Sequence, residues 1–294
     1  MSKTDVVPIA TAIALTSAAR LEVFLHGRPP TTIASYRREL LEMIVAIGRP
    51  LVDVDLEDLQ RYADELCARY ADDDGAPTST VRHRLYVAKS FFAFAAAQGW
   101  IARDPARALR LPKVRDRKDE RILEEREVVR MIGLATDRDH AILRTLYVAG
   151  VRVSELCRLR VRDVTADDRG RGILLVYGKG SKLNRIAIPA SLFADLVRAS
   201  GGRDRAAFIF AGRDRDRPIT RDAVLRIVKR AAIRAGLERM PSPHWLRHAH
   251  GTHAERNGAK VSQIQKTLGH ADARTTLGYL HPDPDDSSAF YVRG

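Results

Sequence analysis

Apolar residues in the first hundred positions recur every three or four residues, which is the spacing of one buried helix face, and no strand-like alternation interrupts them. Three segments have clear limits: Pro29 to Gly48, Asp55 to Asp72, and Thr78 or Ser79 to Gly99. Asp, Ser or Thr caps, proline at the start and glycine at the end are typical helix boundaries. With an earlier amphipathic stretch over 6–25 and a short helical turn at Asp104, the pattern predicts a helical bundle over residues 8–110.

The remainder of the chain has helical patterns around one β element. Short apolar runs at 173–177 and 186–188 flank Gly178-Lys179-Gly180-Ser181-Lys182, which predicts an antiparallel hairpin. Helices are predicted at 142–149, after Thr220, after Ser242, after Lys260 and after Asp272. Residues 111–120 lack apolar periodicity, and four of the ten are Lys or Arg, so they read as a basic linker. The linker could lie across DNA phosphates and bind them, or it could simply be solvated by water. A second domain over 121–294 follows.

Charge narrows the range of partners. The chain has 50 Lys and Arg against 37 Asp and Glu, a net charge of +13 with 45% hydrophobic residues. This composition supports folded cores and favours a polyanion such as nucleic acid over a solubility surface or a membrane. The two cysteines, Cys67 and Cys157, argue against a disulfide framework or a zinc site and fit a reducing cytoplasm. No uninterrupted apolar stretch is long enough to span a bilayer.

Candidate chemistry gathers near the C-terminus. In Ser242-Pro243-His244-Trp245-Leu246-Arg247, serine caps a helix, proline takes its first position, and His244 and Arg247 are three residues apart on one face. A helix N-terminus attracts anions, and these side chains would strengthen a phosphate site. A surface arginine beside a histidine with its hydrogen bonds satisfied is the structural alternative.

Three further residues could contribute. Arg152 follows an apolar helix, just before a predicted Ser154 cap, and needs either an anionic ligand or an ion pair with Glu155. Lys179, at the tip of the predicted turn, could be a general acid because positive surroundings lower a lysine pKa, and Lys182 competes for that role. Tyr279 alone is more typical of packing, but nearby cations such as Arg152, Arg247 and His270 would favour its phenolate.

Taken in order, five segments resemble the tyrosine recombinases, also called the phage integrase family: Gly-Val-Arg152-Val-Ser-Glu155, Gly178-Lys179-Gly180, His244-x-x-Arg247, Leu268-Gly269-His270 and Tyr279. The likeness covers nearly the whole chain. It implies a mainly α fold, with a SAM-like core-binding bundle and an α-rich catalytic domain with a small antiparallel sheet, forming a C-shaped DNA clamp. By similarity to Xer-type members, Tyr279 would be the nucleophile, Arg152 and Arg247 the phosphate-binding arginines and Lys179 the general acid. His244 and His270 would fill the two remaining pocket positions.

The resemblance implies site-specific cleavage and rejoining of DNA through a 3′-phosphotyrosine, by a homo- or hetero-tetramer on two duplexes, with accessory proteins as further partners. No metal, ATP or other cofactor is implied, and the sequence has no HExxH or GxxxxGK[ST] motif. The expected place is the cytoplasm, on the nucleoid. The alternatives are a catalytically silent DNA-binding member and a type IB topoisomerase-like enzyme.

The same resemblance implies contacts to DNA from the second and fourth N-terminal helices and from the helix after Thr220. A steep salt dependence of binding should follow. The candidate side chains are Arg37, Arg38, Arg82, Arg84, Arg221, Arg226, Lys229 and Arg230. The tail departs from the family pattern, because two prolines and three aspartates within 282–286 disfavour the usual C-terminal helix. Phe290, Tyr291 and Val292 could instead fill a groove on a partner subunit.

Overall fold

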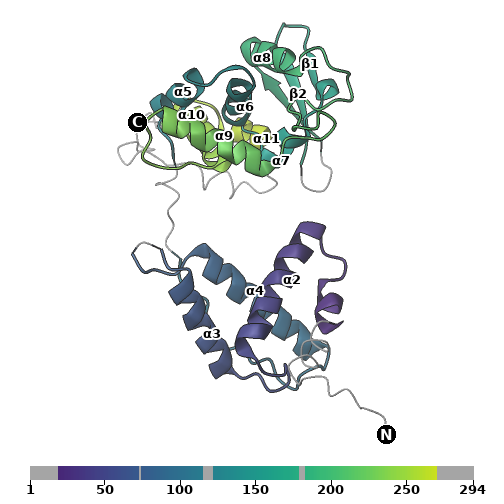
Figure 1. The fold of residues 1–294 in the computed structure, drawn as a ribbon, viewed down its shortest axis with the longest axis vertical. Coiled ribbons are helices and arrows are strands. Elements are labelled where there is room, and N and C mark those ends of the chain that lie inside the picture. Colours follow the sequence, from purple (N-terminus) through teal and green to yellow (C-terminus); the bar gives the residue numbers. More distant parts are fainter. Residues whose placement is uncertain (1–18, 73, 115–121, 179–182, 270–294) are drawn as a thin grey trace, which may run out of the picture. The chain divides into compact units, whose positions relative to one another are not determined.

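The computed structural model describes residues 19–72, 74–114, 122–178 and 183–269. The chain divides into two compact units, Met1–Asp116 and Arg117–Gly294. The ribbon in Figure 1 draws both units, and each is described here by itself. The predicted helical segment at 6–18 and most of the predicted linker lie outside the described residues, while residues 19–25 are helical as expected.

The first unit is the predicted helical bundle. Its main helices are α2 (Pro30–Ile47), α3 (Leu56–Arg69) and α4 (Ser79–Ala97), and each packs against the other two. The predicted boundaries are confirmed: α2 begins at proline and ends at Gly48, which adopts φ +66°. Edge-to-face packing of Phe24 on Phe91 lies within the core. The predicted helical turn at Asp104 is a non-helical turn, in which the aspartate side chain accepts a hydrogen bond from the Ala106 N–H.

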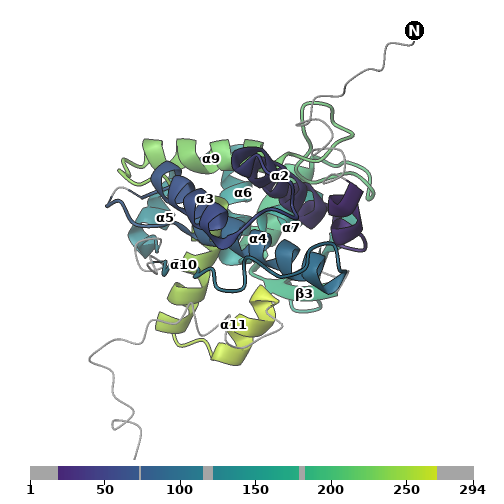
Figure 2. The ribbon, with the colours of Figure 1, turned by 90° about the horizontal axis from the view of Figure 1, so that it is seen from below.

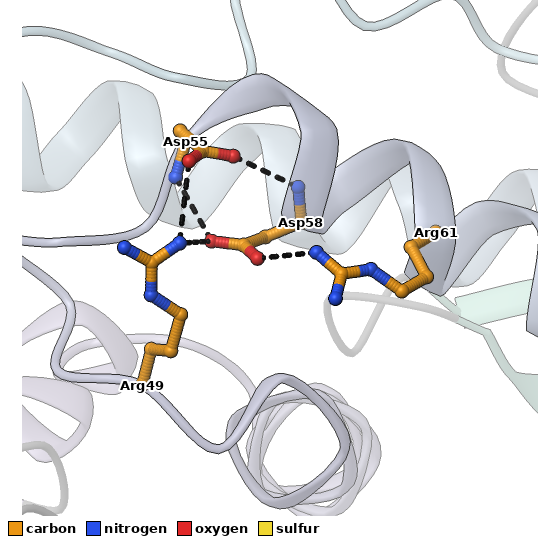
Figure 3. A network of polar contacts seen from close by, with 4 residues as sticks. All are labelled: Arg49, Asp55, Asp58 and Arg61. Carbon is orange, nitrogen blue, oxygen red and sulfur yellow. Dashed lines mark hydrogen bonds and ion pairs between the residues drawn. The ribbon is translucent and has the colours of Figure 1, made fainter.

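A network of two carboxylates and two guanidiniums fixes the start of α3 (Figure 3). Asp55 accepts from the Asp58 N–H at 2.9 Å, and Asp58 accepts from the Asp55 N–H at 3.3 Å, so both caps of a capping box are made. Arg49 bonds both carboxylates, and Arg61 donates to the second oxygen of the nearly buried Asp58. Asp55 is therefore the cap that the sequence predicts, and Arg49 ties the α2–α3 loop to it.

The second unit is α-rich with one small sheet. Its described helices and strands are α5 (Glu125–Gly133), α6 (Asp137–Val148), α7 (Val153–Arg158), a single 3₁₀ turn (Val161–Asp163), β1 (Val164–Ala166), β2 (Gly172–Tyr177), β3 (Leu183–Ile188), α8 (Ala190–Ser200), α9 (Arg221–Arg234), α10 (Pro243–Arg256) and α11 (Val261–Leu268). The predicted antiparallel hairpin is β2 with β3, and the three-stranded sheet has the order β1-β2-β3. Strand β1 and helices α5 and α8 were not predicted.

Helix α6 is the centre of this unit. It packs against α5, α7, α8, α9 and α10, which leaves Ile142, Leu143 and Leu146 fully buried. Helix α8 connects α6 to the sheet through its contacts with β1 and β2. Figure 2 shows α11 between α10 and β3, and α11 contacts both elements. The end of α6, the start of α10 and the end of α11 can therefore contribute to one site.

The structure also describes the two cysteines and the lengths of the apolar helices. Cys157 is buried and Cys67 is partly buried, both thiols are free, and burial raises the pKa of each. Among the described residues, no helix has the length and apolar character needed to cross a membrane.

Candidate active site

Arg247 is the most buried charged group among the described residues of the second unit, with 2% of its surface exposed. As predicted, Ser242 is the N-cap of α10 and Pro243 is its first helical residue. Arg247 therefore lies in the second turn of the helix. Its Nη1 donates to the Gly150 carbonyl oxygen and its Nη2 to the Leu268 carbonyl oxygen. These neutral acceptors orient the guanidinium fork between the ends of α6 and α11.

Arg152 lies two residues beyond that carbonyl acceptor. It is the N-cap of α7, so the prediction of Ser154 as the cap is wrong. Glu155 supplies the capping carboxylate, accepting from the Arg152 N–H at 2.7 Å and from its Nη1 at 2.9 Å. The ion pair considered from sequence is thus present, yet 40% of the arginine side chain is exposed while the carboxylate is buried. Glu155 therefore holds Arg152 in place and leaves part of its fork open to a ligand.

Gly150 makes this junction possible. It adopts φ +59°, and a Cβ there would lie 2.8 Å from His250 Cδ2 and 2.9 Å from Leu268 Cδ2. Both the backbone conformation and the space therefore require glycine. Since its carbonyl holds Arg247 and Arg152 follows two residues later, one turn of backbone sets the position of both arginines.

His244 lies at the start of α10 and is exposed, whereas Arg247 on the same helix is buried. Its ring stands nearly perpendicular to that of His248, with 4.3 Å between centroids. Sequence reasoning missed His248, although its spacing of four residues from His244 is that of helical neighbours. The first two turns of α10 therefore carry two imidazoles and the buried guanidinium.

Two further histidines of α10 belong to the packing beneath these groups. Burial lowers the pKa of His250 to about 4, and the nearby charges of Arg247 and His253 act in the same direction. The Tyr147 hydroxyl and His253 Nδ1 are 2.9 Å apart, and burial raises the pKa of Tyr147 to about 12. A phenol so resistant to ionisation is a poor nucleophile at neutral pH, so the structure does not favour Tyr147 for that role.

The pKa of His250 predicts an acid-labile fold. The folded protein holds this imidazole neutral while the unfolded chain protonates it near pH 6.5, so its contribution to stability is complete above that pH and is lost as pH falls towards 4. The loss should reach about 3 kcal/mol in the free energy of unfolding. Urea unfolding of the wild type and of His250→Gln between pH 7 and 4 measures it. An equal pH slope in both would contradict the assignment, and His26→Gln, which changes an exposed histidine, is the control.

Lys179, Lys182, His270 and Tyr279 lie outside the described residues. The segments that lead to them are described. Strand β2 ends two residues before Lys179 and β3 begins just after Lys182. Helix α11 ends at Leu268, and Gly269 closes it with φ +61° immediately before His270. Strand β3, which follows Lys182, is in direct contact with helix α11, which precedes His270.

The eight DNA-contact candidates differ in surroundings. Arg84 is only 9% exposed, bonds Glu42 and stacks on the Tyr70 ring, so its contacts are those of a packing residue. Arg37 pairs with Glu22, and Arg82 donates to the Pro112 carbonyl at the start of the linker region. Arg38 is 65% exposed. On α9, Arg221, Arg226 and Lys229 are exposed, and Arg230 makes an exposed ion pair with Asp139.

Comparison with known proteins establishes the family of this chain. Residues 121–285 match the phage integrase family model. The chain belongs to the phage integrase family. It is 32% identical to tyrosine recombinase XerC of Xanthomonas axonopodis pv. citri, with 86% of each chain covered, and 34% identical to XerC of Xylella fastidiosa strain 9a5c, covering 88% of this chain and 90% of that one. Tyrosine recombinase XerD of Staphylococcus saprophyticus is 29% identical, over 87% and 89% of the two chains.

Solved structures agree on the fold. A lambda integrase tetramer bound to a Holliday junction has a TM-score of 0.74 at 20% identity, covering 97% of this chain and 85% of that one. A lambda integrase dimer bound to a COC′ core site has a TM-score of 0.72 at 20% identity, with 92% and 96% covered. The predicted mainly α fold with a small antiparallel sheet is confirmed. The protein is an Xer-like tyrosine recombinase, an enzyme of site-specific DNA recombination that cleaves and rejoins DNA.

Proposed function

We propose that Arg152, Lys179, His244, Arg247, His270 and Tyr279 form the active site of this recombinase. The observation that carries the proposal is the junction at Gly150, which sets the positions of Arg152 and Arg247 from one backbone turn. Two guanidiniums held from neighbouring elements can bond different oxygens of one phosphate. The exposed His244 at the start of the same helix as Arg247 adds a donor that can move a proton.

In the proposed reaction, the Tyr279 hydroxyl gives its proton to one of the two histidines, His244 or His270, and the resulting phenolate oxygen attacks a phosphodiester phosphorus. A bond forms between phosphorus and the phenolic oxygen, the bond to the 5′ oxygen breaks, and Lys179 gives that oxygen a proton. The product is a 3′-phosphotyrosine and a free 5′-hydroxyl, and a second 5′-hydroxyl reverses the step to rejoin strands. Arg152 and Arg247 stabilise the additional negative charge of the transition state more than that of the bound diester.

We further propose that DNA lies against α2, α4 and α9 through exposed basic side chains. Arg38 and the α9 residues Arg221, Arg226 and Lys229 support this by their exposure. Arg84 is assigned to the packing of α4 against α2 and α3 instead, because its guanidinium is engaged by Glu42 and Tyr70. Arg37, Arg82 and Arg230 would each exchange a protein partner for phosphate.

The working assembly is proposed to be a tetramer on two duplexes, acting on bacterial DNA at the nucleoid. The fold shared with a lambda integrase tetramer bound to a Holliday junction supports four subunits. Four copies of this chain, or two copies together with two copies of a second recombinase, would satisfy this arrangement. The apolar residues Phe290, Tyr291 and Val292 are the proposed contact to a neighbouring subunit, with accessory proteins as further partners.

A nicked suicide substrate separates the candidate functions. The duplex carries a site recovered by mapping where the protein binds DNA in cells, and the reaction contains EDTA. A recombinase should form a covalent protein–DNA adduct on this site and should recombine two copies of it. A catalytically silent DNA-binding member would bind the site without an adduct. A type IB topoisomerase-like enzyme would form adducts and relax supercoiled plasmids that lack the site, so relaxation without recombination would contradict the proposal.

A further inference from the structure

Asn184 connects the sheet to the end of α11. It lies at the second position of β3, and its Nδ2 donates to the carbonyl oxygens of Lys266 at 3.2 Å and Thr267 at 3.1 Å. The final carbonyls of a helix have no partner within it. The Lys266 carbonyl also accepts from the N–H of the capping Gly269 at 3.2 Å, whereas the Thr267 carbonyl receives a donor from Asn184, 83 residues away in sequence. The sheet therefore fixes the last turn of α11.

The next carbonyl along the chain belongs to Leu268, and it accepts from Arg247 Nη2. Three consecutive carbonyls thus end α11, two held by Asn184 and the third holding Arg247. Gly269 follows in the left-handed region, and a Cβ there would lie 3.3 Å from Asn184 Nδ2. A rotation of this turn would move the Leu268 carbonyl, and with it one of the two acceptors that orient the Arg247 fork.

We infer that Asn184 is a positioning residue for recombination, which acts on DNA cleavage by fixing the carbonyl that orients Arg247. The inference rests on the proposed function of Arg247 as a phosphate ligand. The arrangement also joins β3, which begins just beyond the Gly178–Lys182 turn, to the end of α11, which directly precedes His270. A single amide therefore connects the strand that follows the Lys179 turn to the helix end that precedes His270 and that supplies the carbonyl bonded by Arg247.

The primary variant is Asn184→Asp. It keeps the size of the side chain, removes both N–H donors and turns a carboxylate towards two carbonyl oxygens. We expect the single-turnover rate of adduct formation, with protein saturating the suicide substrate, to fall about tenfold to a hundredfold, as misplacement of a catalytic group does. DNA affinity should stay within about twofold, because the hydrogen bonds that the described structure gives Asn184 go to the backbone carbonyls of Lys266 and Thr267. Asn184→Gln, which restores an amide donor on a longer stem, should recover part of the rate.

The matched control is Asn257→Asp. Asn257 is the only other asparagine of the chain, is exposed and caps the end of α10, so the same charge change is made away from α11. Hydrogen–deuterium exchange of residues 261–269 provides a second readout, and it should accelerate in Asn184→Asp but not in Asn257→Asp. A cleavage rate within twofold of wild type, or a loss that merely follows DNA affinity or unfolding, would overturn the inference.

A double-mutant comparison tests whether Asn184 acts through Arg247. In the Arg247→Lys background the fork is already gone, so Asn184→Asp should lower the remaining cleavage rate by less than threefold. Full multiplication of the two effects would contradict action through Arg247. If Arg247→Lys alone leaves cleavage unchanged, the proposed role of Arg247 fails, and that result is distinct from the failure of Asn184. If Arg247→Lys has no measurable cleavage, the rate and affinity of Asn184→Asp decide the inference.

Discussion

Arg247→Lys is expected to lower the rate of DNA cleavage by about 10²–10³-fold at saturating protein, comparable to the loss of one oxyanion donor. Lysine keeps the positive charge, but a single ammonium cannot reproduce a planar fork that bonds the Gly150 and Leu268 carbonyls and that is proposed to bond a phosphate as well. The single-turnover rate of adduct formation on the suicide substrate measures this loss, and filter binding establishes that the variant saturates the site.

The same substitution should cost stability, since Arg247 is almost fully buried. Leaving one buried carbonyl without its donor costs about 1–3 kcal/mol in the free energy of unfolding. Arg256→Lys is the matched control, because it changes an exposed arginine of the same helix. Cleavage by Arg247→Lys within threefold of wild type, on a protein that is folded and saturating, would contradict the role of Arg247.

Gly150→Ala is expected to destabilise the second unit and to reduce cleavage together. A side chain at φ +59° costs about 1–2 kcal/mol, and crowding of the Cβ against His250 and Leu268 adds about 1–3 kcal/mol. Any shift of Leu268 that relieves this crowding also moves the backbone that holds Arg247. Thermal unfolding and the single-turnover cleavage rate measure the two effects.

Gly201→Ala separates strain from crowding. Gly201 has φ +58° in the same unit, but nothing lies within 4 Å of an added Cβ. It should therefore show the backbone cost alone, with normal cleavage. Equal destabilisation by the two variants, or wild-type cleavage by Gly150→Ala, would show that the crowded junction does not control the site.

Local signals in the sequence were enough for much of the fold. Asp55, Thr220 and Pro243 stand at the starts of α3, α9 and α10 because caps and prolines act on neighbouring backbone groups. The glycine-containing turn with its flanking apolar runs predicted the β2–β3 hairpin for the same reason. Helix α8 also had a signal that was missed, since Leu192, Phe193, Leu196 and Val197 have helical spacing between Pro189 and Gly201.

Other features depend on contacts between distant segments and have no local signature. Strand β1 has three residues and exists through its pairing with β2. Arg84 looks like a solvated helix arginine until Glu42, 42 residues earlier, is placed beside it. Gly150 accepts a hydrogen bond from Arg247, which lies 97 residues later in the chain. Asn184 donates to Lys266 and Thr267, which lie 82 and 83 residues later. The motifs indicate the residue types of the proposed site, whereas the Gly150 backbone that binds Arg247 two residues before Arg152 could not be predicted from them.

The central claim is that Tyr279 forms the covalent bond to DNA, and the adduct itself tests it. The adduct formed on the suicide substrate would be digested with protease and nuclease, and mass spectrometry would locate the tyrosine that carries the nucleotide. The account predicts the modification on Tyr279, its loss in Tyr279→Phe and its persistence in Tyr291→Phe, the tyrosine nearest to the C-terminus. Attachment to Tyr291 or to any other residue, or an undiminished adduct in Tyr279→Phe, would contradict it.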